Sequence, residues 1–113
     1  MANEFRCRTI KNVNAVAGTG SLLYATPDGK SSIMLELDIA NTTSAVVEAS
    51  VQIFDTSATT SAYIVKNAPV PAGGSLMVIA GQKIVLEPTD IVKVTATGAV
   101  DVVAAILEDV NPA

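Results

Sequence analysis

Histidine and tryptophan are absent from the 113 residues, and aromatic side chains make up only 4% of them. Without histidine, the chain cannot form a Ser-His-Asp or Cys-His arrangement, and it lacks the commonest general base at neutral pH. Nearly all zinc sites are excluded for the same reason. The scarcity of aromatic rings requires an aliphatic core, and it argues against a surface that holds sugars.

Only one cysteine, Cys7, is present, so an internal disulfide cannot form and a reducing compartment is expected. We expect Cys7 to be a buried, inert thiol on a strand, because Arg6 and Arg8 would point to the opposite face. Residues 1–4 lack the basic region and apolar stretch of a signal peptide, and no apolar run approaches the roughly 20 residues that span a bilayer. The sequence therefore predicts a soluble protein made in the cytoplasm.

Charged residues form 16% of the chain, against about 25% in typical soluble domains, while hydrophobic residues form 50%. The formal net charge is -4 and the seven basic residues are spread along the chain, so nucleic acid is not expected as a partner. The small cluster of Arg6, Arg8 and Lys11 is predicted to be a solvated strand face rather than an anchor on an acidic neighbour. A small domain this apolar is expected to bury part of its surface against another subunit.

Apolar and polar residues alternate through most of the chain, which is typical of half-buried strands. In residues 33–40 (IMLELDIA), the odd-numbered side chains from Ile33 to Ile39 are predicted to point inward, while Glu36 and Asp38 point outward. A helix would scatter these charges around its circumference, so the pattern predicts a strand.

Residues 47–53 repeat the pattern, with Val47 and Ile53 among the inward-facing side chains. The polar residues 41–44 (NTTS) lie between the two runs and can bond the local backbone as a turn. The sequence therefore predicts an antiparallel hairpin of residues 33–40 with residues 47–53.

Tight turns separate the other short runs: a loop at 18–20, a Pro-Asp-Gly turn at 27–29, a polar loop at 55–61 and a one-glycine turn at Gly81. Their spacing is that of a sandwich or barrel. The remaining predicted strands are residues 5–12, 21–25, 63–66, 75–79, 82–86, 91–96 and 101–107.

Residues 100–107 (VDVVAAIL) do not alternate cleanly and leave two interpretations open. Val100, Val103, Ala104 and Leu107 match the stripe of a short terminal helix. The β-branched residues favour instead a strand covered on both faces, one of which would meet a neighbouring subunit.

Glu36 and Asp38 are the best candidates for paired acids, since they share one strand face about 7 Å apart. That separation is near the range of the two carboxylates of inverting glycosidases. Two charges on the outer face of a strand are ordinary, however, and no aromatic residue lies nearby in the sequence to hold a sugar. We expect neither catalysis nor a dedicated calcium site, because no loop has the alternating Asp/Asn ligands of such a site.

Three further motifs favour structural interpretations. Gly18-Thr19-Gly20 lacks the third glycine and the helix that a dinucleotide site requires. Asn41-Thr42-Thr43 matches a glycosylation acceptor, but no secretory signal accompanies it. The corner at residues 69–74 is predicted to be a rigid bend rather than a peptide-binding site. We therefore assign no catalytic, cofactor-binding or metal-binding residue, and expect no cofactor.

Two segments resemble small virion proteins of tailed bacteriophages, including marine and cyanobacterial ones. Residues 24–33 (YATPDGKSSI), followed by an aliphatic strand ending in Asn41-Thr42-Thr43, are similar to a Y-x-x-P-x-G-K segment, a strand and N-T-[ST] in those proteins. The second half resembles them at YIVK (63–66), PAGGSL (71–76), GQKIVLE (81–87) and DIVKV (90–94).

The resemblance covers residues 20–107 and consists of turns and strands. It implies a β-sandwich that assembles into the particle as an oligomer, in which Tyr24, Lys30, Tyr63 and residues 71–75 are structural. It also implies a protein made in the host cytoplasm and then packed into the virion, with no catalytic residues to transfer.

Together, these observations predict an all-β protein: residues 1–113 form a single antiparallel β-sandwich, jelly-roll or Greek-key-like, of about eight to nine short strands. We expect a non-enzymatic virion component whose partners are copies of itself and other virion proteins, such as the major capsid protein or tail and neck proteins, with no nucleic acid or membrane. A capsid decoration or cement protein is the first choice. The alternatives are a neck, tail or fibre-attachment protein, then a carbohydrate-binding module, and last an enzyme.

Overall fold

The computed structural model describes residues 4–13 and 21–109, and every regular element within these residues is a strand. The predicted all-β class is therefore confirmed, and residues 100–107 lie in a strand rather than a helix. The strands are β1 (Glu4–Val13), β2 (Ser21–Ala25), β3 (Ser32–Asn41), β4 (Val47–Asp55), β5 (Thr60–Val70), β6 (Ser75–Leu86), β7 (Ile91–Ala96) and β8 (Val100–Glu108).

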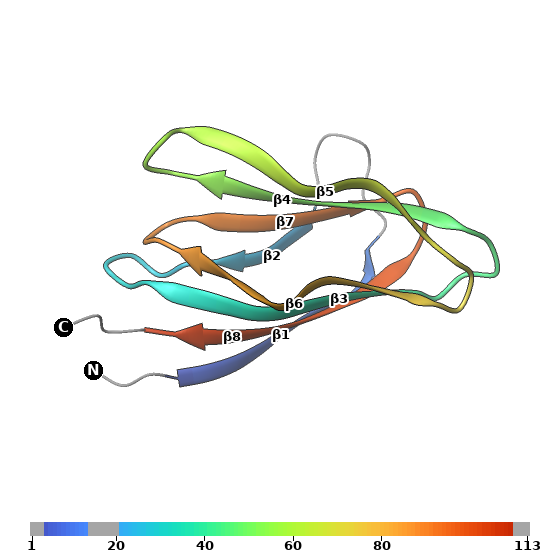
Figure 1. The fold of residues 1–113 in the computed structure, drawn as a ribbon, viewed down its shortest axis with the longest axis horizontal. Helices are drawn as coiled ribbons and strands as arrows, with labels where there is room; N and C mark the ends of the chain where they lie inside the picture. Colours follow the sequence, from blue (N-terminus) through green and yellow to red (C-terminus); the bar gives the residue numbers. More distant parts are fainter. Residues whose placement is uncertain (1–3, 14–20, 110–113) are drawn as a thin grey trace.

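The strands form two four-stranded sheets, which lie face to face as two layers (Figure 1). Sheet A has the order β1-β8-β3-β6, sheet B has the order β2-β7-β4-β5, and every pairing is antiparallel. Strand β1 pairs with β8, β2 with β7, β3 with β6 and β4 with β5, so the chain follows one long hairpin that is rolled up across both sheets. This arrangement is a jelly roll, one of the two sandwich topologies that the sequence predicts.

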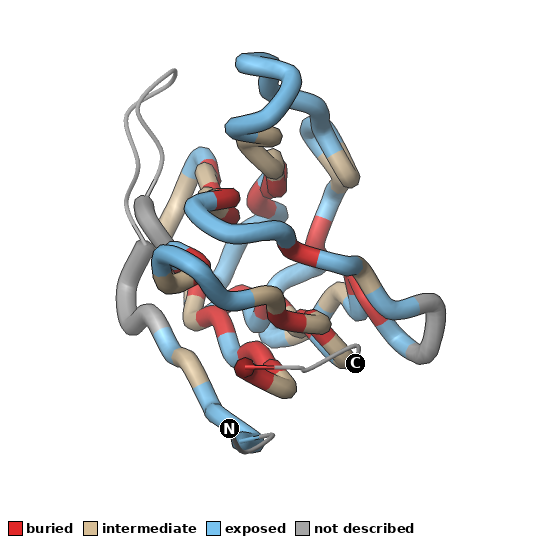
Figure 2. Tube along the Cα trace, turned by 90° about the vertical axis from the view of Figure 1, so that its left-hand side faces the viewer, coloured by how far each residue is buried: buried red, intermediate tan, exposed pale blue. Residues whose placement is uncertain are grey.

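The core lies between the sheets and is aliphatic, as the scarcity of aromatic residues predicts. Strand β8 alternates between buried and more exposed positions. Figure 2 shows buried and exposed positions following one another along the trace. The alternation arises because successive side chains of a strand point to opposite faces of its sheet. The largest side chains without solvent exposure are Met34, Leu37, Ile39, Ile79, Leu86 and Ile106.

The predicted hairpin of residues 33–40 with residues 47–53 is wrong. Strand β3 belongs to sheet A and β4 to sheet B, and the segment between them crosses from one layer to the other. Both runs alternate because each buries one face, but they bury it from opposite sides of the core. Alternation alone determines which face is buried and does not determine the partner strand.

Asn41 fixes this crossing and is itself buried. Its Nδ2 atom donates to the carbonyl oxygens of Ala45 at 2.7 Å and Val70 at 2.9 Å. Its Oδ1 atom accepts hydrogen bonds from the amide nitrogen of Thr43 at 2.8 Å and from the Thr43 hydroxyl at 2.7 Å. Asn41 is therefore a buried structural brace, and its side-chain amide nitrogen is already occupied.

The predicted turn at Gly81 is also wrong, because β6 continues through this position and merges the two predicted strands. The register with β3 shifts between the pairs Glu36–Ala80 and Met34–Ile84, so the extra residues are accommodated as a bulge. Lys83 lies in this bulge with a φ of 50°.

The same irregularity changes which side chains of β3 face the core. Met34 is fully buried, whereas Ile33 is half-buried and pairs with Leu107 and Val85. The prediction that Ile33 points inward is therefore wrong, while the inward orientation of Leu37 is confirmed. A bulge in a strand shifts the phase of the alternation by one position, which the sequence pattern alone does not reveal.

Other predicted turns are confirmed with small changes of extent. The Pro-Asp-Gly turn joins β2 to β3, with a hydrogen bond from the Lys30 nitrogen to the Pro27 oxygen and a φ of 75° at Gly29. The corner after β5 leads from sheet B to sheet A, and Gly74 donates to the Pro71 oxygen there. The polar loop predicted at 55–61 is shorter, since its ends belong to β4 and β5. The loop predicted at 18–20 lies outside the described residues.

Candidate functional site

The outer face of sheet A, which points away from the core, carries most of the exposed apolar side chains. Of the six large hydrophobic side chains exposed in the described part of the chain, Phe5, Met77, Val85 and Val103 belong to this face. Phe5 is 79% exposed and Val103 is 47% exposed. Contiguous apolar surface of this kind marks interaction sites on soluble proteins, so this face is the candidate site.

The strand registers arrange these side chains into rows. Phe5 pairs with Leu107, Leu107 with Ile33, and Ile33 with Val85, so one apolar row crosses all four strands of sheet A. Strand β8 therefore presents one buried and one open face, and the open face is the one that was expected to meet a neighbouring subunit. Its being covered by a subunit stays a prediction.

Glu36 and Asp38 lie in the centre of the same face. Ala105 is opposite Glu36 and Val103 is opposite Asp38, so both acids have small or apolar cross-strand neighbours on β8. Asp38 raises the pKa of Glu36, first through a hydrogen bond between the two carboxyl groups and then through charge repulsion. The predicted outward orientation of both acids is confirmed.

This contact between the two carboxyl groups weakens the catalytic alternative. The acids of inverting glycosidases stand about 6.5–9.5 Å apart so that a water molecule fits between them. Glu36 and Asp38 are instead close enough for Asp38 to raise the pKa of Glu36. One oxygen of this pair, Oδ1 of Asp38, is shielded from solvent and has no hydrogen-bond partner among the described residues.

Cys7 belongs to this outer face as well, opposite Ala105, and it is exposed. The prediction of a buried thiol is therefore wrong. Strand β1 is an edge strand whose outer side chains have no covering layer, and sequence alternation does not distinguish a covered face from an open one. Its neighbours Arg6 and Arg8 lie on the opposite side of β1, as predicted, since their partners Ile106 and Ala104 are buried.

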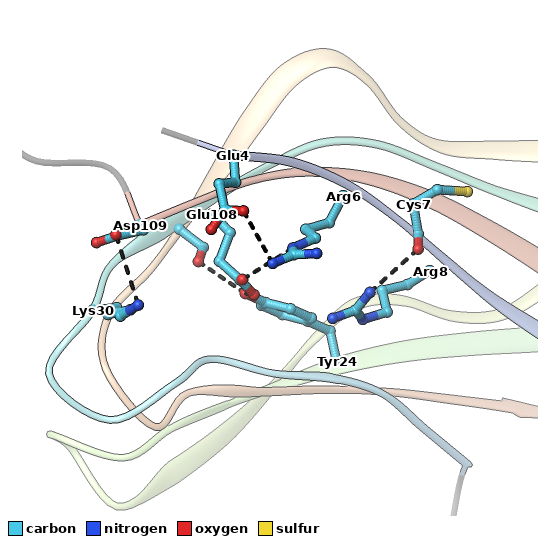
Figure 3. Close-up of polar contacts among 9 residues, drawn as sticks. Glu4, Arg6, Cys7, Arg8, Tyr24, Lys30, Glu108 and Asp109 are labelled. Carbon is cyan, nitrogen blue, oxygen red and sulfur yellow. Dashed lines mark hydrogen bonds and ion pairs between the residues drawn. The ribbon is translucent and has the colours of Figure 1, made fainter. Parts of the chain in front are cut away.

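A polar network joins the two sheets at one end of the sandwich (Figure 3). Tyr24 reaches from β2 in sheet B to Glu108 and Ser32, which are cross-strand partners in sheet A. Its hydroxyl donates to Oε2 of Glu108 at 2.5 Å, so the Ser32 hydroxyl, 2.9 Å away, donates to the Tyr24 oxygen. Tyr24 and Ser32 are buried, and Glu108 is 8% exposed.

The protonation of this network is fixed at neutral pH. Burial and the hydrogen bond with Glu108 raise the pKa of Tyr24 to about 12. The same hydrogen bond, together with Arg6, lowers the pKa of Glu108. A general acid or base needs a pKa near the working pH, so the pair is suited to holding the sheets together rather than to proton transfer.

Two of the N-terminal basic residues take part in this network, and Arg6 stays exposed, as the prediction of a solvated face requires. Arg6 pairs with Glu4 at 3.2 Å and with Glu108 at 3.3 Å, and the guanidinium of Arg8 lies 5.7 Å from the centre of the Tyr24 ring. These contacts of Arg6 and Arg8 hold the edge strand β1 against Glu108 and Tyr24 of the same chain. The side chain of Lys11 is not among those described.

The residues named as structural by the resemblance have different surroundings. Tyr24 is buried in the network, and Lys30 pairs with Asp109 at 3.7 Å. Tyr63 is 49% exposed on the outer face of sheet B, with the Lys66 ammonium 5.1 Å from its ring centre. Tyr24 and Lys30 thus have contacts inside the fold, whereas Tyr63 is a surface residue.

One group of acids that the sequence analysis did not single out lies where two turns meet. Carboxylate oxygens of Asp55, Glu87 and Asp90 lie within 4.8 Å of one another. Asp90 accepts hydrogen bonds from the amide nitrogens of Thr56 and Glu87, and Asp55 accepts from Ser57, which lowers the pKa of Asp55. Hydrogen bonds within the turns thus explain the positions of the Asp55 and Asp90 carboxylates without a metal ion.

Comparison with protein-family models, with curated proteins and with solved structures found no match for this chain. The resemblance to virion proteins therefore stays an expectation. In the described part of the chain, no helix is long and apolar enough to cross a membrane.

Sequence reasoning missed the pairing of Glu108 with Tyr24, although a signal was present. Val100, Val102, Ala104 and Ile106 alternate along β8 as inward residues, and the next inward position is Glu108. A carboxylate in the inward phase of a strand needs a buried partner. The partner itself, on β2, follows only from the topology.

Proposed function

We propose that this chain is a non-enzymatic structural subunit that assembles with copies of itself on a larger particle. A single observation carries the proposal: the outer face of sheet A presents an apolar row across all four strands, with Phe5 and Val85 at its two ends. Exposure of apolar surface to water is unfavourable. Burial of this face against a neighbour would contribute about 25 cal/mol of favourable free energy per Å² of apolar surface.

A virion is the particle that we propose first. The resemblance to small virion proteins of tailed phages supports it, and so does the jelly roll, a topology used by viral capsid domains as well as by lectins and cupins. The role is mechanical: many weak apolar contacts, repeated over many copies, hold each subunit more firmly than one contact does. A capsid decoration or cement protein fits best, and a neck, tail or fibre-attachment protein is the alternative.

The carbohydrate-binding alternative is weaker than the sequence suggested. Tyr24 is buried, so its ring cannot stack on a sugar, and Tyr63 is half-exposed beside Lys66. A glycan array with the wild-type chain and with Tyr63→Ala tests this alternative. Binding that is lost in Tyr63→Ala would favour it over the structural role.

The oligomeric state tests the main proposal. Sedimentation velocity over a wide concentration range is expected to show reversible association. A low concentration of detergent, added without salt, is expected to reverse this association by covering the apolar face. A chain that stays monomeric at the highest concentration would contradict self-assembly.

Copy number in purified particles tests the location. Quantitative mass spectrometry of gradient-purified virions is expected to find this chain in proportion to the major capsid protein. A few copies per particle would indicate the neck or tail, and absence from the particles would contradict the virion role.

A further inference from the structure

We propose that the outer face of sheet A binds the outer face of sheet B of a second copy of this chain. The inference rests on the proposed self-assembly and names the two surfaces that meet. It follows from the condition of the sheet edges, from the apolar surface described above and from the charges on the two faces.

The sheet edges are poorly suited to pairing with another chain. Strand β5 contains Pro69 and a residue in the left-handed region, Asn67 with a φ of 52°, and β6 is interrupted by the bulge at Lys83. Strand β2 has only five residues. Strand β1 directs Arg6 and Arg8 to its inner side. Short strands, proline, bulges and inward-pointing charges are the devices that prevent edge pairing, so the faces remain as contact surfaces.

The outer face of sheet A is apolar with an acidic centre. Glu36 and Asp38 stand side by side on β3, and Asp101 lies on the same face at its β8 partner Ala40. Oδ1 of Asp38 has no hydrogen-bond partner among the described residues. Basic groups of a partner surface can pair with the carboxylates at the centre of this face.

The outer face of sheet B carries two basic side chains, Lys93 on the interior strand β7 and Lys66 on the edge strand β5. Lys93 of β7 is opposite Gln52 of β4, and Gln52 is opposite Tyr63 of β5, whose ring carries the Lys66 ammonium. The described acid on this face is Glu48, which lies toward the other end of β4, opposite Pro69. The two ammonium groups thus match the two adjacent carboxylates of sheet A in sign.

Packing of sheet A against sheet A of the second copy is disfavoured by the same charges. A two-fold contact would bring Glu36 and Asp38 against their own equivalents, and burying unpaired carboxylates costs several kcal/mol per ion. Packing of sheet A on sheet B places ammonium groups there instead. Sheets packed face to face lie about 10 Å apart, which lets side chains of both faces interdigitate.

Such a contact is heterologous, because it joins two different surfaces. Each copy then offers a free sheet A face on one side and a free sheet B face on the other. Repetition of the contact produces a closed ring or an open filament rather than a two-fold dimer. Charge complementarity also makes the association weaker as the salt concentration rises.

Charge exchange tests the inference. The first variant carries Glu36→Lys and Asp38→Lys, and the second carries Lys66→Glu and Lys93→Glu. In each variant alone, the outer faces of sheet A and sheet B carry charges of the same sign. Self-association of each variant is therefore expected to weaken by about a hundredfold or more. An equimolar mixture restores opposite signs at every contact, and it is expected to recover association in sedimentation velocity.

A control variant, Asp28→Lys with Glu87→Lys, has the same net charge as the first variant but changes exposed positions in turns. It is expected to associate like wild type. Circular dichroism establishes that all variants are folded. If a variant does not fold, zero-length carbodiimide cross-linking of isotopically light and heavy wild-type chains gives the same answer, with expected intermolecular links from Glu36 or Asp38 to Lys66 or Lys93.

The possible outcomes separate the inference from the proposed function. If wild type associates but the Lys66→Glu and Lys93→Glu variant associates equally well, sheet B is not the partner surface and the inference is overturned, while self-assembly stands. If each variant is monomeric and the mixture stays monomeric too, the pairing of these two faces is also contradicted. A wild-type chain that never associates overturns the inference and the proposed self-assembly together.

Discussion

The hydroxyl of Tyr24 donates a hydrogen bond of 2.5 Å to Glu108, and this bond connects β2 of sheet B to β8 of sheet A. The rest of the space between the sheets is filled mainly by aliphatic side chains, which pack without directional preference. A charged hydrogen bond at one end of such a core therefore fixes how the two sheets are aligned.

Removal of the Tyr24 hydroxyl is expected to destabilise the fold. Tyr24→Phe keeps the ring in the core but leaves Oε2 of Glu108 without its donor, while Arg6 still pairs with Oε1. Loss of a hydrogen bond to a charged group costs about 1.5–3 kcal/mol. Urea unfolding followed by circular dichroism measures the change. Tyr63→Phe is the matched control, because the Tyr63 hydroxyl is on the surface, and its effect is expected to stay within about 0.5 kcal/mol. Equal effects of the two substitutions would contradict the role of the bond.

The free energy of unfolding at alkaline pH is expected to depend on the ionisation of Tyr24. Its pKa is about 12 in the folded chain against the ordinary 10.0, so the folded state retains the proton more tightly than the unfolded state. The stabilisation, about 3 kcal/mol for a shift of this size, is complete below pH 10.0 and is lost as pH rises toward 12. Unfolding free energy measured across this window is expected to fall in wild type and to fall less in Tyr24→Phe.

The free energy of unfolding at acid pH is expected to depend on the protonation of Glu108. Its pKa is lowered in the folded chain, chiefly by the Tyr24 hydrogen bond, so the folded state binds this proton less readily than the unfolded state. The contribution is present above the ordinary pKa of 4.5 and is lost as pH falls through the folded value. Tyr24→Phe is expected to flatten the decline below pH 4.5. An unchanged acid slope in that variant would show that other carboxylates cause the decline.

The fold class could be predicted because alternation of apolar and polar residues survives in nearly every strand. In β4, Val47 and Val51 are buried as the pattern indicates. The partner strands could not be predicted, because two runs that bury opposite sides of one core alternate in the same way as two strands of a hairpin. The register shift between Met34 and Glu36 and the continuous β6 were missed for a related reason: an extra residue in one strand becomes visible only against its partner strand.

The candidate site was only partly predictable. Composition indicated that apolar side chains would remain exposed, and the outward orientation of Glu36 and Asp38 followed from the alternation. That Phe5 and Val85 stand in one row follows only from the order of the strands in sheet A. Cys7 illustrates the same limit: a residue in phase with a strand face can be assigned to that face, but the sequence does not say whether another layer covers it.

Asn41 is expected to tolerate substitution poorly. In Asn41→Asp, one oxygen would face the carbonyl oxygens of Ala45 and Val70, where the wild-type nitrogen donates two hydrogen bonds. Loss of both donors and burial of a carboxylate together are expected to lower the unfolding free energy by about 3 kcal/mol or more. Thr42→Ala is the control, since its exposed hydroxyl makes one bond, to the Ala99 oxygen, and an effect near 1 kcal/mol is expected. Equal midpoints in urea for the two variants would contradict the bracing role of Asn41.

Ile106 and Val103 on β8 separate stability from assembly, because they are near neighbours on opposite faces of the same strand. Ile106 is fully buried, so Ile106→Ala is expected to lower the unfolding free energy by about 2–5 kcal/mol through lost burial and a residual cavity. Val103 is 47% exposed, and Val103→Thr keeps its shape and β-branching, so stability is expected to change by less than about 1 kcal/mol. The added hydroxyl puts a polar group beside Asp38 on the outer face of sheet A, and self-association measured by sedimentation velocity is expected to weaken. A folded Val103→Thr variant that assembles like wild type would contradict a role of the apolar face of sheet A in the assembly contact. Ile106→Ala, in the same strand, shows how a loss of stability alone affects assembly.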